Sequence, residues 1–152
     1  MQIKKILNSK GIEKLIEKNY GCKIKLKNLF ITKNDKIWLA AKEINLNKIK
    51  KIKRCYRIGI YFGKLKRNNK IKLSIEGANI VGKKATKNVA LINEKEAIKF
   101  IEGNDIYNFK EVNCELNNFI ILKNGEDIIG VGILRNGYIE NLIPKARRMK
   151  LL

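Results

Sequence analysis

The stretch RIGIYFGKLKRNNKIKLSIE, residues 57–76, decides how the basic first half of the chain folds. Residues 57–65 are rich in β-branched and aromatic side chains and contain two glycines, which favour a bulge or a close backbone approach. Residues 70–76 alternate apolar side chains with lysine, serine and glutamate, as a half-buried strand does. With the Asn-Asn pair at 68–69 as the turn, the stretch predicts a β-hairpin whose lysines are mounted on folded sheet.

Positive charge is concentrated around this hairpin. Residues 48–73 contain eleven Lys or Arg residues and no Asp or Glu. Of the net charge of +20, residues 1–86 carry +19 and residues 87–152 carry +1. A hydrated face that aids solubility is the simple explanation for such a run. Because self-repulsion destabilises a compact fold, we favour a polyanionic partner, and the step in charge indicates two units with different roles.

The rest of the composition narrows the class of protein. A chain of 152 residues with 45% hydrophobic residues can bury a core, as one domain or two small ones. With no recognisable membrane span or signal peptide, a soluble cytoplasmic protein without a membrane partner is expected. Cys22, Cys55 and Cys114 lack a metal-binding spacing and are expected to be reduced. Without histidine, or carboxylates at the spacing of a metal-dependent nuclease, we expect no catalytic residue, metal or cofactor.

Apolar periodicity and turn residues outline the other elements of the first half. A helix is expected to follow Ser9 and to end at Gly21, and residues 40–52 are expected to form a helix or helical turn. Residues 23–31 and 36–40 have the pattern of strands. These two strands would form a second hairpin.

The second half is expected to consist mainly of strands, after a short helix or turn and a basic connector at 77–87. Asn93, followed by Glu96, is expected to cap a helix over 94–102 that ends at Gly103. The expected strands are 88–92, 118–125, 127–134 and 138–143. Short strands with one capped helix favour a small open barrel.

Particular segments of the chain resemble known RNA-binding families. The second half resembles a PUA domain, the module named after pseudouridine synthases and archaeosine transglycosylases, in NVALINEKEAIKFIEGNDIYNF (88–109) and in the glycine-paired hairpin GEDIIGVGIL (125–134). The first half resembles the domain before the PUA module in the Nip-seven-type ribosome-assembly factor of archaea and eukaryotes, in GIYFGKLKRNNKIKLSIEGANIVGKKATKNV (59–89). The C-terminal part of archaeal Nol/Nop/Sun-type RNA cytosine-5 methyltransferases is similar to KLSIEG (72–77) together with ENLIPKARR (140–148).

The resemblance implies an α+β fold, with an N-terminal α/β pre-PUA domain at 1–80 and a small β-barrel-like PUA domain at 86–152. It covers residues 50–152 well and residues 1–49 weakly. The methyltransferases also carry a catalytic domain with a glycine-rich cofactor loop and catalytic cysteines beside proline, and this chain has neither motif. The resemblance therefore implies an RNA-binding part without its enzyme.

Three basic segments are the candidate RNA-binding sites: the hairpin, the connector and the C-terminal segment 144–150. In the hairpin, Tyr61 is the expected base-stacking residue and Phe62 is expected in the core. The C-terminal segment is distinctive because residues 87–143 sum to −3. The resemblance places it in the last PUA strand, on the RNA-binding side, and a frayed terminus is the alternative. The candidate RNA-binding residues are Lys50, Lys51, Lys53, Arg54, Arg57, Tyr61, Lys64, Lys66, Arg67, Lys70, Lys72, Lys83, Lys84, Lys87, Lys145, Arg147, Arg148 and Lys150.

The charge and the resemblance together imply a non-catalytic RNA-binding protein of ribosome biogenesis, rRNA processing or RNA modification. It would grip structured rRNA or tRNA through basic surfaces of both domains. Its protein partners would be an RNA methyltransferase or other ribosome-assembly factors. Two alternatives stay open: the RNA-binding subunit of a split RNA (cytosine-5) methyltransferase, and a nucleic-acid-coating protein without selectivity.

Overall fold

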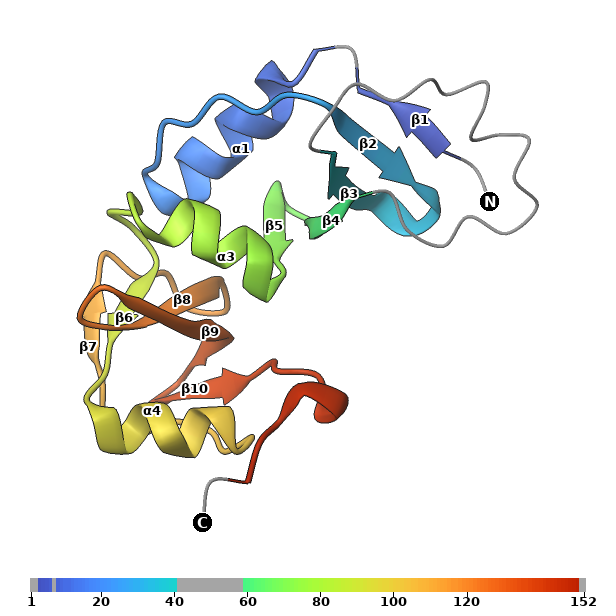
Figure 1. Ribbon diagram of the computed structural model, residues 1–152. Coiled ribbons are helices and arrows are strands. Elements are labelled where there is room, and N and C mark those ends of the chain that lie inside the picture. The colour runs from blue at the N-terminus through green and yellow to red at the C-terminus, as the bar shows by residue number, and fades with distance from the viewer. Residues whose placement is uncertain (1–2, 7, 41–58, 151–152) are drawn as a thin grey trace.

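The computed structural model describes residues 3–6, 8–40 and 59–150, which form an α+β protein on two five-stranded sheets (Figure 1). The first sheet is antiparallel throughout, in the order β1-β2-β3-β4-β5. Its strands are β1 (Ile3–Lys5), β2 (Leu29–Thr32), β3 (Lys36–Leu39), β4 (Ile60–Lys66) and β5 (Lys70–Leu73), with a 3₁₀ turn, η1 (Lys33–Asp35), between β2 and β3. Both predicted hairpins of the first half are confirmed.

The predicted first helix is confirmed as α1 (Lys10–Tyr20), which ends at Gly21 in the left-handed conformation. Ser9 precedes it, but its hydroxyl donates to a Glu13 carboxylate oxygen at 2.9 Å and caps no backbone group. The same oxygen accepts the backbone N–H of Leu26 at 2.8 Å. The prediction of a strand over 23–31 is therefore wrong for its first six residues, because this part of the chain bonds to the helix and joins no sheet.

The predicted hairpin is confirmed as β4 and β5, with Lys66 opposite Lys70. The strand prediction over 70–76 is nevertheless wrong for its last three residues. Ser74 accepts the backbone N–H of Gly77 at 2.9 Å and so caps a helix, α3 (Ile75–Gly82). A short helix was expected only from residue 77 onward, whereas the cap at Ser74 makes it begin at Ile75.

The second sheet has the order β10-β9-β8-β6-β7 and curls into a half-barrel (Figure 1). Its strands are β6 (Val89–Leu91), β7 (Lys110–Val112), β8 (Phe119–Asn124), β9 (Asp127–Arg135) and β10 (Tyr138–Asn141). β6 is parallel to β8, and the other neighbours are antiparallel. The four predicted strands are confirmed, and the three-residue β1 and β7 are additions that the sequence pattern did not predict.

The capped helix of the second half is confirmed as α4 (Glu94–Ile101). The side chain of Asn93 accepts the backbone N–H of Glu96 at 2.9 Å. Phe100 on this helix is fully buried. Gly103 follows the helix with a φ of 104°, a conformation that favours glycine.

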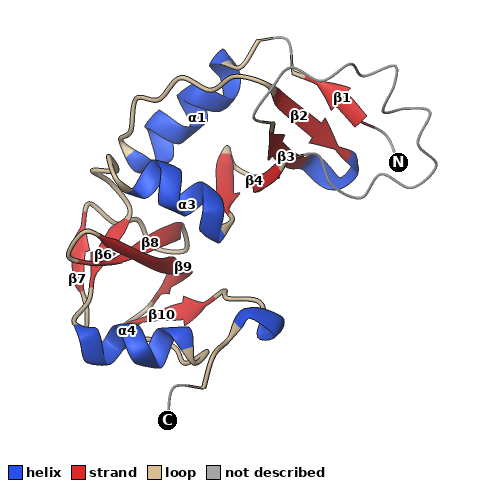
Figure 2. Cartoon of the chain, in the orientation of Figure 1, coloured by secondary structure: helices blue, strands red, loops and turns tan. Residues whose placement is uncertain are grey.

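Helix α3 lies between the two sheets and packs against β4 of the first and β9 of the second (Figure 1). The largest cluster of buried side chains accordingly includes Phe62 and Leu73 from the first sheet, Val81 from α3, and Ile121 and Val131 from the second. Helix α4 covers the other face of the second sheet with a separate cluster (Figure 2). The division into domains 1–80 and 86–152 stays a prediction: each sheet belongs to one of these parts, and the core between them is shared.

A buried asparagine network also joins the two halves. The Asn19 side chain donates to two backbone carbonyl oxygens, at 2.8 and 2.9 Å, and accepts from Asn118 at 3.3 Å. Asn88 donates to the backbone oxygen of Asn19 and accepts the backbone N–H of Glu115 at 2.9 Å. Because each of these groups is buried and satisfied, the network holds one sheet in a defined position relative to the other.

The described parts of the chain contain no helix with the length and apolar character that crossing a membrane requires. Cys22 and Cys114 are free thiols, as predicted, and Cys22 belongs to the shared core. Cys55 and residues 41–52 of the predicted helix or helical turn lie outside the described residues.

Candidate nucleic-acid interface

A register shift between β3 and β4 places the neighbouring aromatic residues Tyr61 and Phe62 on opposite faces of the first sheet. Gly63 lies opposite Ile37 and Tyr61 lies opposite Trp38, so Phe62 is an extra residue in β4. Phe62 is fully buried in the shared core, which confirms the prediction for this residue. Tyr61 points to the outer face of the sheet, where its ring centroid is 5.2 Å from that of Trp38. The bulge therefore places Tyr61 on the same face as the lysines that follow it.

Five lysines lie on this outer face of the first sheet and are called the lysine face: Lys36, Lys64, Lys66, Lys70 and Lys72. Lys36, Lys64 and Lys72 are directly opposite one another on three adjacent strands, and Lys66 is opposite Lys70. Like charges at directly opposite positions destabilise a sheet. Such rows are therefore unfavourable in the free protein and become favourable when an anion covers them.

Burial and this crowding both act on the pKa of Lys72. Partial burial lowers the pKa of its ammonium, and the positive charges of Lys66 and Lys64 lower it further. The ammonium of Lys36 is 5.7 Å from the ring centroid of Tyr61, and that of Lys70 donates to the backbone oxygen of Asn117 at 2.9 Å. Within the described residues, no acidic side chain forms an ion pair with the lysine face.

Lys36 was not among the predicted RNA-binding residues. It stands first in the strand KIWLA, and nothing local distinguishes it from other exposed lysines. A signal becomes visible only when the two predicted hairpins are placed side by side, because that pairing aligns Lys36 with Lys64.

The connector lysines differ from one another. Lys83 and Lys84 are exposed and follow the C-terminal end of α3, the end opposite to its cap at Ser74. Lys87 is held in place, because its ammonium donates to the backbone oxygen of Lys18 at 3.1 Å and pairs with Glu115 at 2.8 Å. The structure thus gives Lys87 a role in joining the two halves, whereas Lys83 and Lys84 remain free cations within the described residues.

The C-terminal segment is a 3₁₀ turn, η2 (Lys145–Arg147), so the expectation that it forms the last strand is wrong. Neither is it a frayed terminus. Arg147 pairs with Glu76 on α3 at 3.0 Å, and the Nε of Arg148 donates to the backbone oxygen of Ile143 at 3.1 Å. The backbone N–H of Met149 donates to the oxygen of Ile101 at 3.1 Å. Pro144 opens the turn, and Lys145 and Lys150 are exposed.

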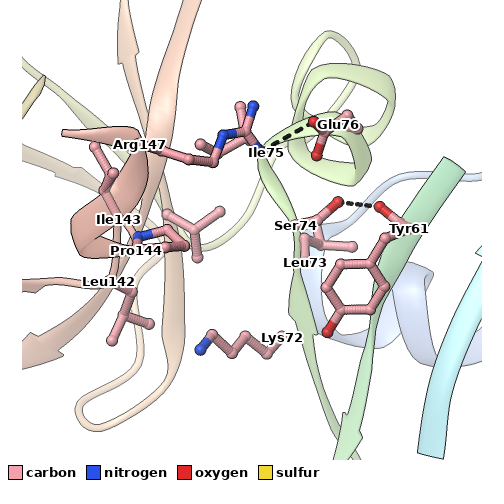
Figure 3. A pocket seen from close by; sticks show the side chains of 11 residues that line it. Tyr61, Lys72, Leu73, Ser74, Ile75, Glu76, Leu142, Ile143, Pro144 and Arg147 are labelled. Atoms are coloured by element: carbon pink, nitrogen blue, oxygen red, sulfur yellow. Dashed lines mark hydrogen bonds and ion pairs between the residues drawn. The ribbon is translucent and has the colours of Figure 1, made fainter. Parts of the chain in front are cut away.

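A pocket of about 130 Å³ lies where this turn faces the lysine face (Figure 3). Lys72 and Tyr61 border it from the first sheet, Glu76 from α3, and Pro144 and Arg147 from the C-terminal segment. Figure 3 shows the side chain of Lys72 extending across the pocket toward the C-terminal segment. The structure therefore brings together three predicted RNA-binding residues that are separated by up to 86 positions in the sequence.

The other candidates divide into two groups. Lys64, Lys66 and Lys70 share the lysine face with Lys72, and Arg67 is exposed in the turn between the strands. The predicted residues Lys50, Lys51, Lys53, Arg54 and Arg57 lie outside the described residues. No grouping of Cys, Asp or Glu that could hold a metal ion occurs in the described ranges.

No family model matches the chain, and no curated protein is significantly similar to it.

Proposed function

We propose that the chain is a non-catalytic RNA-binding protein that grips the phosphate backbone with its lysine face. The observation that carries the proposal is the alignment of Lys36, Lys64 and Lys72 across three strands without an acidic partner among the described residues. Adjacent strands are about 4.8 Å apart, so the row extends over roughly 10 Å. A polymer of phosphates can neutralise several positions of this surface at once, whereas a small anion reaches one or two of them.

The choice of RNA over other polyanions is supported by the sequence resemblance. We propose that the first sheet with α1 and α3 is a pre-PUA domain and that the curled second sheet is a PUA domain. A structured RNA of ribosome biogenesis or of RNA modification is then the expected partner, bound mainly through shape and backbone. The cytoplasm is the proposed location.

The salt dependence of binding tests this proposal. The affinity for a structured RNA stem-loop is measured at several salt concentrations for the wild type and for a triple variant, Lys64→Glu, Lys66→Glu and Lys72→Glu. Each lost phosphate contact lowers the slope of log affinity against log salt by about one. We expect the triple variant to bind more weakly and with a slope smaller by about two to three.

A matched control changes the charge by the same amount elsewhere. Lys95→Glu, Lys110→Glu and Lys123→Glu alter three lysines of the second half that have no ion pair within the described residues. We expect the slope of log affinity against log salt for this control to stay close to that of the wild type. Equal slopes in the wild type and the lysine-face variant would reject the proposal, and equal affinity for duplex DNA of the same length would indicate a non-selective protein.

A further inference from the structure

We infer that the pocket between Tyr61, Lys72 and Arg147 receives one unpaired nucleotide of the bound RNA, with its base against the apolar walls and its phosphate on Lys72. This inference rests on the proposed function and specifies the class of RNA that the protein selects. Its basis is the composition of the pocket, its continuity with the lysine face and the pairing of Arg147 with Glu76.

The walls of the pocket are chiefly apolar, and the polar groups are few. Leu73 and Ile75 line it from the first half, and Val131, Leu142 and Pro144 line it from the second. An inorganic anion would leave the apolar walls without a contact, and an aliphatic ligand would leave the two cations without a partner from the ligand. A flat aromatic ring that carries a phosphate matches both features, since aromatic and apolar side chains hold bases and cations hold the backbone.

The pocket is continuous with the lysine face because Lys72 belongs to both. On the sheet it is the last member of the row that begins at Lys36, and in the pocket it extends toward the C-terminal segment (Figure 3). A strand of RNA whose phosphates follow the row therefore arrives at the mouth of the pocket. At this point the next nucleotide of the RNA can turn away from the lysine face and enter the pocket.

The pairing of Arg147 decides which cation meets the phosphate. Glu76 lies 3.0 Å from a terminal nitrogen of Arg147, so the charge of this guanidinium is already compensated. The ammonium of Lys72 has no acidic partner within the described residues, and the positive Lys64 and Lys66 are its charged neighbours on the sheet. The phosphate is thus assigned to Lys72. Arg147 has five N–H donors, and those that Glu76 leaves free can bond to the edge of a base.

The surroundings of the pocket are fixed before a ligand arrives. The hydroxyl of Ser74 bonds to the backbone oxygens of Tyr61 and Phe62 and also caps α3, so the wall that carries Tyr61 is braced. The ring of Tyr61 also lies against that of Trp38, with centroids 5.2 Å apart and planes tilted by 46°, and the indole nitrogen of Trp38 donates to the hydroxyl of Thr32 at 3.0 Å. A preorganised wall of this kind binds with little loss of side-chain freedom.

An unpaired nucleotide fits the pocket better than a nucleotide within a duplex. A paired base must first be unstacked and unpaired, which costs a few kilocalories per mole and costs least for a base that is already single-stranded. Bulges and loops supply such bases, and they are the places where proteins read RNA. The pocket is therefore expected to favour RNA with a bulge or loop next to a stem.

The test compares two RNA hairpins that differ only in one bulged adenosine in the stem. Affinities of the full chain are measured at the same salt concentration, and a separate copy of the bulged hairpin carries 2-aminopurine in place of the bulged adenosine as a fluorescent probe. We expect the bulged hairpin to bind about tenfold more tightly, equivalent to about 1.4 kcal/mol, and the probe fluorescence to change on binding. Equal affinities, with an unchanged probe signal, would overturn the inference.

A pocket-filling variant provides the second arm. Leu142→Trp introduces a large side chain at the pocket wall without altering charge, and Leu116→Trp adds the same side chain at an exposed site of the second half. We expect the ratio of the two affinities to fall toward one in Leu142→Trp and to persist in Leu116→Trp. If Leu142→Trp does not fold, the comparison of the two hairpins with the wild type still decides the matter.

The possible outcomes separate this inference from the proposed function. Equal and salt-dependent binding of both hairpins would remove the pocket from the mechanism and leave the lysine face as the RNA-binding site. Absence of binding to either hairpin would reject the proposed function itself. Adenosine monophosphate that saturates the pocket at low micromolar concentration, without any preference for the bulge, would assign the pocket to a free nucleotide and overturn the inference.

Discussion

Replacement of Lys72 by methionine is expected to stabilise the protein and, at the same time, to weaken its binding of RNA. Lys72 is directly opposite Lys64 in the sheet, and Lys66 contributes a further repulsion. Methionine keeps most of the apolar stem of the side chain and removes only the charge. The two effects have opposite signs because the same crowding of cations opposes folding and favours a polyanion.

The magnitude follows from the geometry of the pair. Side chains at directly opposite positions have Cβ atoms about 5 Å apart, and two ammonium charges at that separation in water repel by about 0.8 kcal/mol. The ammonium groups can diverge into solvent, and salt screens them with a Debye length of about 10 Å at 0.1 M. For Lys72→Met we therefore expect a gain of about 0.5 kcal/mol at low salt, or about 1–2 °C in Tm, and less in 0.5 M salt.

The dependence on pH provides an independent check of the sign. The pKa of Lys72 is lower in the folded protein than in the unfolded chain. In the range between these two pKa values the unfolded state binds more protons, so the stability of the wild type rises with pH. The advantage of Lys72→Met is thus expected in full below the lowered pKa of the folded state, should decrease as the pH rises through that pKa, and should be absent above the unfolded pKa of about 10.4, where the lysine is neutral in both states.

Urea denaturation is the appropriate assay because urea, unlike guanidinium chloride, does not screen charges. Lys110→Met serves as the control, since Lys110 is exposed and lies opposite Leu91 in β7 and β6. Its stability is expected to change little. A loss of stability in Lys72→Met at low salt, with Lys110→Met unchanged, would refute the like-charge reasoning.

Four further substitutions test the surrounding fold. Asn88→Ala removes two hydrogen bonds at a fully buried position with a φ of 55°, and we expect urea denaturation to show a loss of about 2 kcal/mol or more. Gly132→Ala places a methyl group 2.6 Å from a backbone oxygen and should destabilise the second sheet, whereas Gly11→Ala meets no atom within 4 Å in α1 and should raise Tm slightly. Glu76→Gln breaks the ion pair with Arg147 and should cost about 0.5 kcal/mol at neutral pH. Although burial opposes it, the helix N–H and the guanidinium lower the pKa of Glu76, so this difference should disappear in thermal melts as the pH falls below about 4.

Local sequence patterns were sufficient to predict the elements whose stabilising contacts are local. The alternation of residues 70–73 determines which side chains face the core, and Ile71 and Leu73 are indeed buried there. The pair Asn93 and Glu96 predicted the start of α4, because the cap that holds it involves only those two residues. Each of these predictions depends on atoms within a few positions of one another.

Other features depend on contacts that no local pattern contains. Alternation continues through Ile75, so the pattern favours a strand where the structure has a helix. The hydroxyl of Ser74 decides between the two, because it bonds to the backbone of β4 as well as to Gly77. Likewise, Tyr61 and Phe62 are adjacent residues with similar propensities, and the register against Trp38 determines which of them is buried.

Charge composition illustrates the same limit for the candidate site. In the sequence, Arg147 and Lys72 are equivalent cations. In the structure, Glu76, which is 71 positions before Arg147, compensates the charge of Arg147 and not that of Lys72. The sequence also gives no reason to include Lys36, which becomes significant only because two hairpins pair and align it with Lys64. Net charge thus predicts that a polyanion binds, and strand register determines which cations lie close enough together to bind it. The proposed function consequently depends on the register of β3, β4 and β5, and the urea and salt experiments on the lysine face test that register as directly as they test RNA binding.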